Sequence, residues 1–175
     1  AASDVYKRQI SSGMDVNLQV ESSCIRKAMA AAKENASEGD NVADIIIVSD
    51  TLVEDPDDER AALGKPKDES SAAFSLIRLS GRRHRVWSST AILSRITGDI
   101  EVGEDWLATI WTDYAIVEFE NMREDEIIGL INSRSWEGRA GGYDSVSYTH
   151  LRARETGRNR VGRRLGEKKN VGGGG

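Results

Sequence analysis

The hydrophobic pattern of the first third of the chain predicts a helix followed by a buried strand. From Glu21, apolar residues recur at three- and four-residue steps, which is typical of an amphipathic helix, and Gly39 should end it. The preceding residues 10–20 have a polar pattern that predicts an extended stretch. Residues 44–50 (DIIIVSD) are a continuous β-branched run between polar residues, which predicts a strand buried on both faces. The charged residues 54–67 are expected to form a loop.

The rest of the pattern alternates between helix and strand signals. Asp68 is placed to cap a second helix, which Gly81 should end. The alternation predicts the α/β class, with a mixed twisted sheet and flanking helices. The further elements expected are a strand at 84–93, one long or two short strands at 106–119, a loop at 96–103, a helix at 124–131 and a glycine-rich turn at 136–143 leading to another strand.

Composition narrows the class of protein. The chain has 175 residues, of which 38% are hydrophobic and 30% charged, as in a soluble globular protein. No apolar run approaches the ~20 residues of a membrane span, and no signal segment stands at the start, so we expect a cytoplasmic protein without a membrane partner. The single cysteine, Cys24, excludes an internal disulfide, and two histidines make a histidine-based metal site improbable.

The net charge of −5 is unevenly distributed along the chain. Residues 151–171 carry a net charge of +6, so the remainder carries −11. A basic tail on an acidic body is one way to bind nucleic acid, and it also arises when the tail does not belong to the domain. Residues 145–175 have no hydrophobic period and end in four glycines, so we expect them to be disordered.

Candidate chemistry begins at the end of the predicted strand 44–50. A carboxylate such as Asp50 at a strand end can hold a divalent cation or orient a water molecule, and the Thr51 hydroxyl can donate to a phosphate. The alternative is that Asp50 only caps a turn. Lys65 lies in a Gly-Lys-Pro-Lys segment that suits an anion, although a solvated turn would look the same. For His84 we favour a packing role in a strand over acid–base catalysis.

Four of these motifs, in this order and spacing, resemble the Maf family of nucleoside triphosphate pyrophosphatases. They are Asp50-Thr51, Gly64-Lys65-Pro66, the segment 79–86 (LSGRRHRV) and the segment 138–143 (GRAGGY). The resemblance implies a Maf-like fold and hydrolysis of a nucleoside triphosphate to a monophosphate and pyrophosphate. It also implies a divalent cation, Mg²⁺ or Mn²⁺, and a house-cleaning role. Family members often form dimers, so a homodimer is expected.

The resemblance also implies roles for individual residues. Asp50 would bind the metal and activate water, and Lys65 would hold the polyphosphate. Lys33 on the first helix would be a second phosphate contact, and Arg139 stands where the family usually has lysine. Asp15 is the candidate for an acidic residue of the family. The substrate-binding set implied in this way is Asp15, Lys33, Thr51, Lys65 and Arg139.

The sequence departs from the family pattern at both ends. It lacks the family's Ser-x-Ser-Pro-Arg-Arg loop and the Ile-Gln-Gly segment after the tyrosine, and both ends resemble translated sequencing-adapter read-through. We therefore expect a truncated Maf-like domain at 10–144, incomplete at both ends, between foreign tails at 1–9 and 145–175. Two alternatives stay open: a non-catalytic nucleotide-binding remnant, and nucleic-acid binding through the basic tail, for which the tail lacks interleaved aromatic residues.

Overall fold

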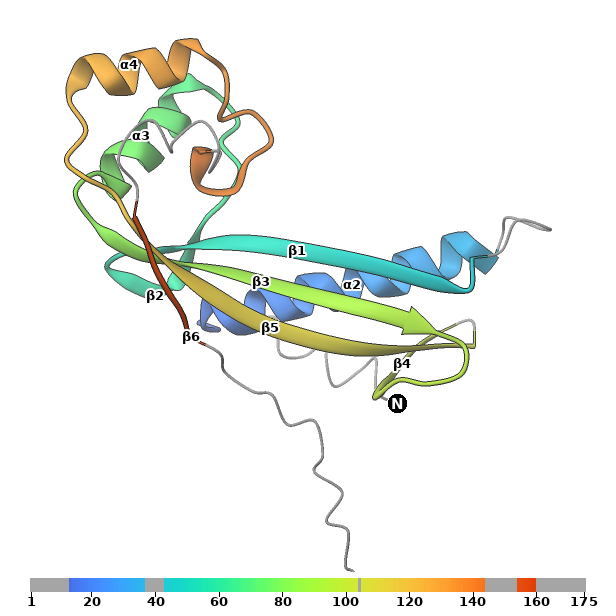
Figure 1. The fold of residues 1–175 in the computed structure, drawn as a ribbon. Helices are drawn as coiled ribbons and strands as arrows, with labels where there is room; N and C mark the ends of the chain where they lie inside the picture. The colour runs from blue at the N-terminus through green and yellow to red at the C-terminus, as the bar shows by residue number, and fades with distance from the viewer. Residues whose placement is uncertain (1–12, 37–42, 104, 144–153, 160–175) are drawn as a thin grey trace, which may run out of the picture.

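The fold is an antiparallel sheet with helices packed against it (Figure 1). The computed structural model describes residues 13–36, 43–103 and 105–143 and the backbone of 154–159. Its sheet has the order β2-β1-β3-β5-β4, with β6 paired to β5, and every described pairing is antiparallel. The strands are β1 (Ile45–Asp55), β2 (Asp58–Leu63), β3 (Arg83–Ser94), β4 (Ile100–Gly103), β5 (Trp106–Glu118) and β6 (Arg154–Asn159). The helices are α2 (Val16–Ala36), α3 (Glu69–Leu79), α4 (Glu124–Asn132) and the 3₁₀ turn η1 (Ala140–Gly142).

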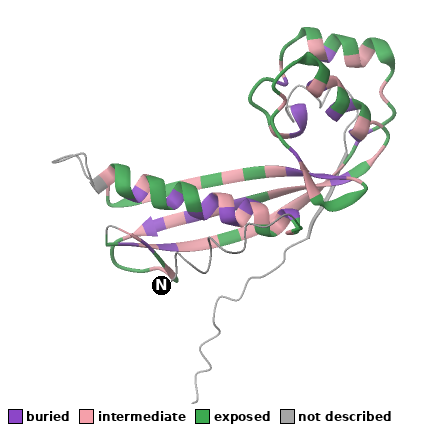
Figure 2. Cartoon of the chain, turned by 180° about the vertical axis from the view of Figure 1, so that it is seen from behind, coloured by how far each residue is buried: buried purple, intermediate pink, exposed green. Residues whose placement is uncertain are grey.

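The first of two hydrophobic cores lies between α2 and one face of the sheet. Small residues of α2, namely Cys24, Ala28 and Ala32, are fully buried against Leu93 and Trp106 of the sheet. Their four-residue spacing puts them on one side of the helix, and their small size lets the helix approach the strands closely. Figure 2 shows α2 lying along the sheet with buried and exposed residues on different sides.

The second core lies at the other end of the sheet, where α3, α4 and η1 gather (Figure 1). Leu76 and Leu79 of α3 are fully buried there, together with Val53 of β1 and Phe119 after β5. The Asp68 side chain accepts a hydrogen bond from the Ser71 backbone N–H, which confirms the predicted cap of α3. The two cores leave a stretch of β1 between them.

The α/β class and the flanking helices are confirmed, while the sheet is antiparallel where a mixed one was expected. The prediction that residues 44–50 form a strand buried on both faces is wrong. Ile45 and Ile47 are 60% and 66% exposed, because α2 covers only one face of β1 and the side chains alternate.

Three boundaries also differ from the predictions. The stretch 10–20 contains the start of α2 at Val16, since the helix period extends further back than the apolar pattern suggests. The predicted charged loop 54–67 holds the end of β1 and all of β2, and the predicted loop 96–103 holds β4. Cross-strand pairing, which the local pattern does not reveal, stabilises these polar segments as strands.

The structure also corrects the expectation for the C-terminal tail, residues 145–175. Residues 154–159 pair with β5 as strand β6, so the expectation of disorder over 145–175 is wrong for this segment. The strand expected directly after the turn 136–143 lies outside the described residues. Among the described helices, none has the length and apolar character that a membrane crossing requires.

Candidate functional site

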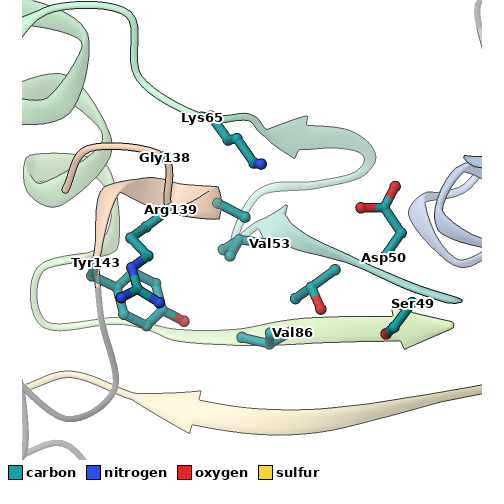
Figure 3. Close-up of a pocket in the computed structure, with 10 residues that line it drawn as sticks. Ser49, Asp50, Val53, Lys65, Val86, Gly138, Arg139 and Tyr143 are labelled. Atoms are coloured by element: carbon teal, nitrogen blue, oxygen red, sulfur yellow. The ribbon is translucent and has the colours of Figure 1, made fainter. Parts of the chain in front are cut away.

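A cavity of about 390 Å³ opens over the middle of β1, between the two cores. Figure 3 shows side chains from β1, β3, the loop after β2 and the glycine-rich turn around η1 pointing into it. Its volume is within the usual range of small-molecule sites. The residues that line it are Ser49, Asp50, Thr51, Val53, Lys65, Val86, Gly138, Arg139, Ala140 and Tyr143.

Asp50 forms an ion pair with Lys27 of α2 at one end of the cavity. The Lys27 Nζ lies 2.7 Å from Asp50 Oδ1 and donates a second hydrogen bond of 3.0 Å to the Ser49 carbonyl. Burial alone would raise the pKa of the Asp50 carboxyl, but hydrogen bonds from Lys27 and Ser23 and the Lys27 charge together lower it below its usual value. The carboxylate is therefore ionised at neutral pH and can act as a base or as a ligand for a cation.

Two further cations, Lys65 and Arg139, line the cavity from segments far apart in the sequence. The Gly141 N–H donates a 3.1 Å hydrogen bond to the Gly64 carbonyl, which ties the glycine-rich turn to the loop that carries Lys65. Gly141 has φ +70°, and a Cβ at this position would lie 2.8 Å from the Val53 side chain. Glycine is thus required here both by the backbone conformation and by the close approach of the turn to β1.

The other end of the cavity is apolar and aromatic. Val53 and Val86, which are cross-strand partners in β1 and β3, form its floor beside Tyr143. The Tyr143 hydroxyl lies 2.9 Å from Nε2 of His84, a histidine of β3 that is only 3% exposed. The cavity therefore has a carboxylate at one end and, at the other, an apolar surface with Arg139 beside Tyr143.

The structure brings four of the sequence-predicted residues together: Asp50, Thr51, Lys65 and Arg139 all line the cavity. Asp50 lies in the middle of the eleven-residue strand β1, so the argument that it stands at a strand end is wrong. Glu54, the first residue of the predicted charged loop 54–67, is buried and accepts a hydrogen bond from the Trp87 indole N–H.

The structure places two predicted residues outside the cavity lining. Asp15 lies half-exposed just before α2, with a carboxylate oxygen 3.6 Å from Arg60. Lys33 is exposed on α2, six residues after Lys27, and its contact with phosphate stays a prediction that its position does not favour.

Sequence reasoning missed Lys27, the lysine that contacts Asp50. A signal was present, because Lys27 follows buried Cys24 by three residues and precedes buried Ala28 by one. This spacing places Lys27 at the border of the buried face of α2, where a long side chain reaches the sheet.

The site has cations that suit a polyanion and one carboxylate that can act as a base. Among the residues that line the cavity, Asp50 is the one carboxylate, and the described residues contain no group of three or more His, Cys, Asp or Glu side chains arranged to hold a metal ion. A phosphorylated substrate in the cavity would meet Lys65 and Arg139, whose charges suit phosphate oxygens, while Lys27 is paired with Asp50 and does not line the cavity.

Comparison with known proteins gives one consistent picture. A family profile described as "Maf-like protein" matches residues 2–153. The chain is 37% identical over 113 residues to a protein of Roseobacter denitrificans named dTTP/UTP pyrophosphatase, covering 64% of this chain and 53% of that protein. It is 38% identical over 119 residues to a protein of the same name from Syntrophotalea carbinolica, covering 68% and 49%. A nucleoside triphosphate pyrophosphatase of Anaplasma phagocytophilum is 36% identical over 84 residues, covering 48% and 39%. The chain spans about half the length of the first two relatives.

Proposed function

The chain belongs to the Maf-like protein family, and we propose that its cavity binds a nucleoside triphosphate and hydrolyses it to a nucleoside monophosphate and pyrophosphate. One observation carries the proposal above the others. An ionised carboxylate, Asp50, shares a cavity with Lys65 and Arg139 and is ion-paired to Lys27. This combination supplies a base for water and cations for phosphates, which is what phosphoanhydride hydrolysis requires.

The cations have the largest part in this mechanism. Negative charge on the phosphate oxygens must be stabilised as the anhydride bond breaks, and positioned cations do this best in a cavity that excludes water. Lys65 and Arg139 approach from two segments that the Gly141–Gly64 hydrogen bond holds together. Asp50 orients and deprotonates the attacking water, and Lys27 keeps the carboxylate ionised for that role.

A divalent cation, Mg²⁺ or Mn²⁺, fits this donor set. Mg²⁺ is commonly held by one or two carboxylates together with the phosphates of the substrate, so a cage of several acids is not needed. In this cavity Asp50 would hold the ion with the substrate's phosphate oxygens. When bound, the cation neutralises phosphate charge and polarises the scissile anhydride.

The apolar end suits the nucleoside. Val53, Val86 and Tyr143 offer an apolar surface at the end of the cavity away from Asp50, where Arg139 also lies. Two of the relatives are named for dTTP and UTP, so we propose a pyrimidine nucleoside triphosphate as the preferred substrate. The cytoplasmic setting and the homodimer remain predictions, for cell fractionation and size-exclusion chromatography to check.

The proposal is tested by measuring pyrophosphate release from dTTP, UTP and ATP with Mg²⁺, using wild-type protein and Asp50→Asn. We expect release with dTTP or UTP, and a loss of about 10²-fold or more in kcat for Asp50→Asn, the contribution typical of a general base. Asp99→Asn is the matched control, because Asp99 is exposed in the loop before β4 and lies outside the cavity. Full activity of Asp50→Asn would refute the catalytic assignment.

A binding measurement beside this assay tests the alternative that the chain is a non-catalytic nucleotide-binding remnant. A chain that binds a non-hydrolysable α,β-methylene dTTP but releases no pyrophosphate would be a non-catalytic nucleotide-binding protein. This alternative stays open because the chain spans only about half the length of these relatives. Most of the basic tail proposed for nucleic acid lies outside the described residues, so that alternative stays a prediction.

A further inference from the structure

His84 is a buried titratable group for which the proposed mechanism has no role. It lies in β3 opposite Val117 of β5 and is 3% exposed. It does not line the cavity, but its Nε2 lies 2.9 Å from the hydroxyl of Tyr143, which does. His84 therefore stands directly behind a cavity wall.

The rings around His84 hold Tyr143 in one orientation. His84 and Tyr143 meet edge-to-face with centroids 5.8 Å apart, and Phe119 contacts both rings at 5.2 and 5.0 Å, also edge-to-face. Edge-to-face contacts favour particular ring planes, and the hydrogen bond between His84 and Tyr143 adds a fixed direction to them. The Tyr143 ring is thus held on two sides and at its hydroxyl.

Tyr143 in turn fixes the segment that carries a phosphate-binding cation. It follows Gly142 directly, and the Gly142 N–H donates a 3.1 Å hydrogen bond to the carbonyl of Arg139. The neighbouring Gly141 is bonded to Gly64, the residue before Lys65. A displacement of Tyr143 would therefore move Arg139 and loosen the link to the Lys65 loop.

We propose that His84 is a positioning residue of the nucleotide site, which holds Tyr143 through its Nε2 and so keeps Arg139 in place across the cavity from Asp50. The inference rests on the proposed function, because Arg139 is a phosphate contact only if the cavity takes a nucleotide. A buried imidazole is costlier than an apolar ring of the same size, so shape alone does not account for histidine here.

The first test measures KM and kcat for dTTP in four variants. His84→Phe keeps the ring but removes the hydrogen bond, whereas His84→Gln keeps a polar nitrogen near the position of Nε2. We expect His84→Phe to lower kcat/KM about tenfold, the size of one lost hydrogen bond to a buried group, because a displaced Arg139 stabilises the phosphates less well in the transition state. His84→Gln should restore kcat/KM to within about threefold of wild type. Tyr143→Phe and the double variant His84→Phe/Tyr143→Phe should match His84→Phe alone, since all three remove one hydrogen bond.

A second test does not depend on activity. Amide hydrogen exchange at Gly141, whose N–H bonds to the Gly64 carbonyl, reports whether the turn is held in place. His84→Phe should speed this exchange at least tenfold. Leu130→Ala, which weakens the same hydrophobic core from α4, is the control for general destabilisation and should leave Gly141 close to wild type once exchange is corrected for global stability.

The outcomes separate the inference from the proposed function. If wild-type protein neither binds nor hydrolyses a nucleotide, the proposed function fails, and the inference fails as a statement about nucleotides. Unchanged Gly141 exchange in His84→Phe would overturn the positioning role whatever the activity. Additive effects of His84→Phe and Tyr143→Phe, or no rescue by His84→Gln, would also overturn it, since the two residues would then act separately.

Discussion

At the scale of single residues, the ion pair between Lys27 and Asp50 decides the chemistry of the cavity. Burial works against the charge on Asp50, and Lys27, 2.7 Å away, works for it. The balance lowers the pKa of the carboxyl, so the charged form persists to lower pH than in an exposed aspartate. Without Lys27, less would oppose the effect of burial, which raises the pKa of Asp50.

Lys27→Met should therefore raise the pKa of Asp50. The acid limb of the kcat/KM profile against pH should move to higher pH, because a base with a raised pKa is protonated sooner as pH falls. Carboxyl ¹³C NMR of Asp50 gives the same pKa directly. Lys33→Met is the matched comparison on the same helix, and a larger shift from Lys33→Met than from Lys27→Met would show that the wrong lysine has been placed beside Asp50.

His84 makes the free energy of unfolding depend on pH. Burial lowers its pKa from 6.5 to about 4, against a smaller opposite effect of the Arg82 backbone carbonyl. The unfolded chain therefore binds a proton more readily than the folded one between these values, so this contribution to stability is complete above pH 6.5 and is lost as pH falls toward 4.

Between pH 7 and pH 5, wild-type protein should lose about 2 kcal/mol more stability than His84→Gln. Urea denaturation of both proteins at the two pH values measures the difference. Carboxylates with lowered pKa, such as Asp55, also lose stability in acid, but they do so equally in both proteins. Equal losses in the two proteins would mean that His84 is not buried as a neutral ring.

At the scale of elements, the glycine-rich turn lines one side of the cavity. Gly138 and Gly141 both have positive φ, but their surroundings differ. A Cβ on Gly141 would meet Val53 at 2.8 Å, whereas no atom lies within 4 Å of a Cβ on Gly138. The pair therefore separates backbone strain from close packing.

Gly138→Ala should cost about 1 kcal/mol, the penalty of a side chain at positive φ. Gly141→Ala should cost about 1–3 kcal/mol more and also raise KM, because the turn must move away from β1. Thermal unfolding and steady-state kinetics of both variants measure these effects. Equal costs would contradict the close approach of the turn to Val53.

The elements also show what local sequence can predict. The cap of α3 at Asp68 and the span of α4 were predictable because capping and helical periodicity are short-range. Strand β2 was not, because its charged residues become a strand only by pairing with Val53 and Glu54 of β1. The exposed face of β1 was missed for a related reason: the run of isoleucines does not reveal how many faces a helix covers.

The candidate site was predictable only where its residues fall in motifs. Asp50, Lys65 and Arg139 could be grouped through the family resemblance, and the structure places them around one cavity. Lys27 and the His84–Tyr143 hydrogen bond were not grouped, because each contact joins residues distant in the sequence. Their meeting depends on how α2 and the glycine-rich turn pack on the sheet.

At the scale of the whole molecule, two separate cores flank the cavity, and a ligand would contact elements attached to both. Asp50, which is paired with Lys27 of α2, belongs to the side of the first core, while Arg139 and Tyr143 belong to the side of α3 and α4. A nucleotide bound between them should stabilise the molecule as a unit, because only the folded chain brings these residues together.

We therefore expect α,β-methylene dTTP at about 100 times its Kd to add about 2.7 kcal/mol of stability. For a chain of this size, that corresponds to a rise in Tm of about 5–10 °C. Differential scanning calorimetry with and without Mg²⁺ measures the shift. Absence of a shift at any nucleotide concentration would contradict binding at this cavity.

The measurement that tests the central claim most directly is ³¹P NMR of dTTP incubated with the protein and Mg²⁺. If the cavity at Asp50 acts as we propose, the triphosphate signals give way to those of dTMP and pyrophosphate, and Asp50→Asn leaves the triphosphate intact. Formation of dTDP and inorganic phosphate, or the same products from Asp50→Asn at an undiminished rate, would contradict the account.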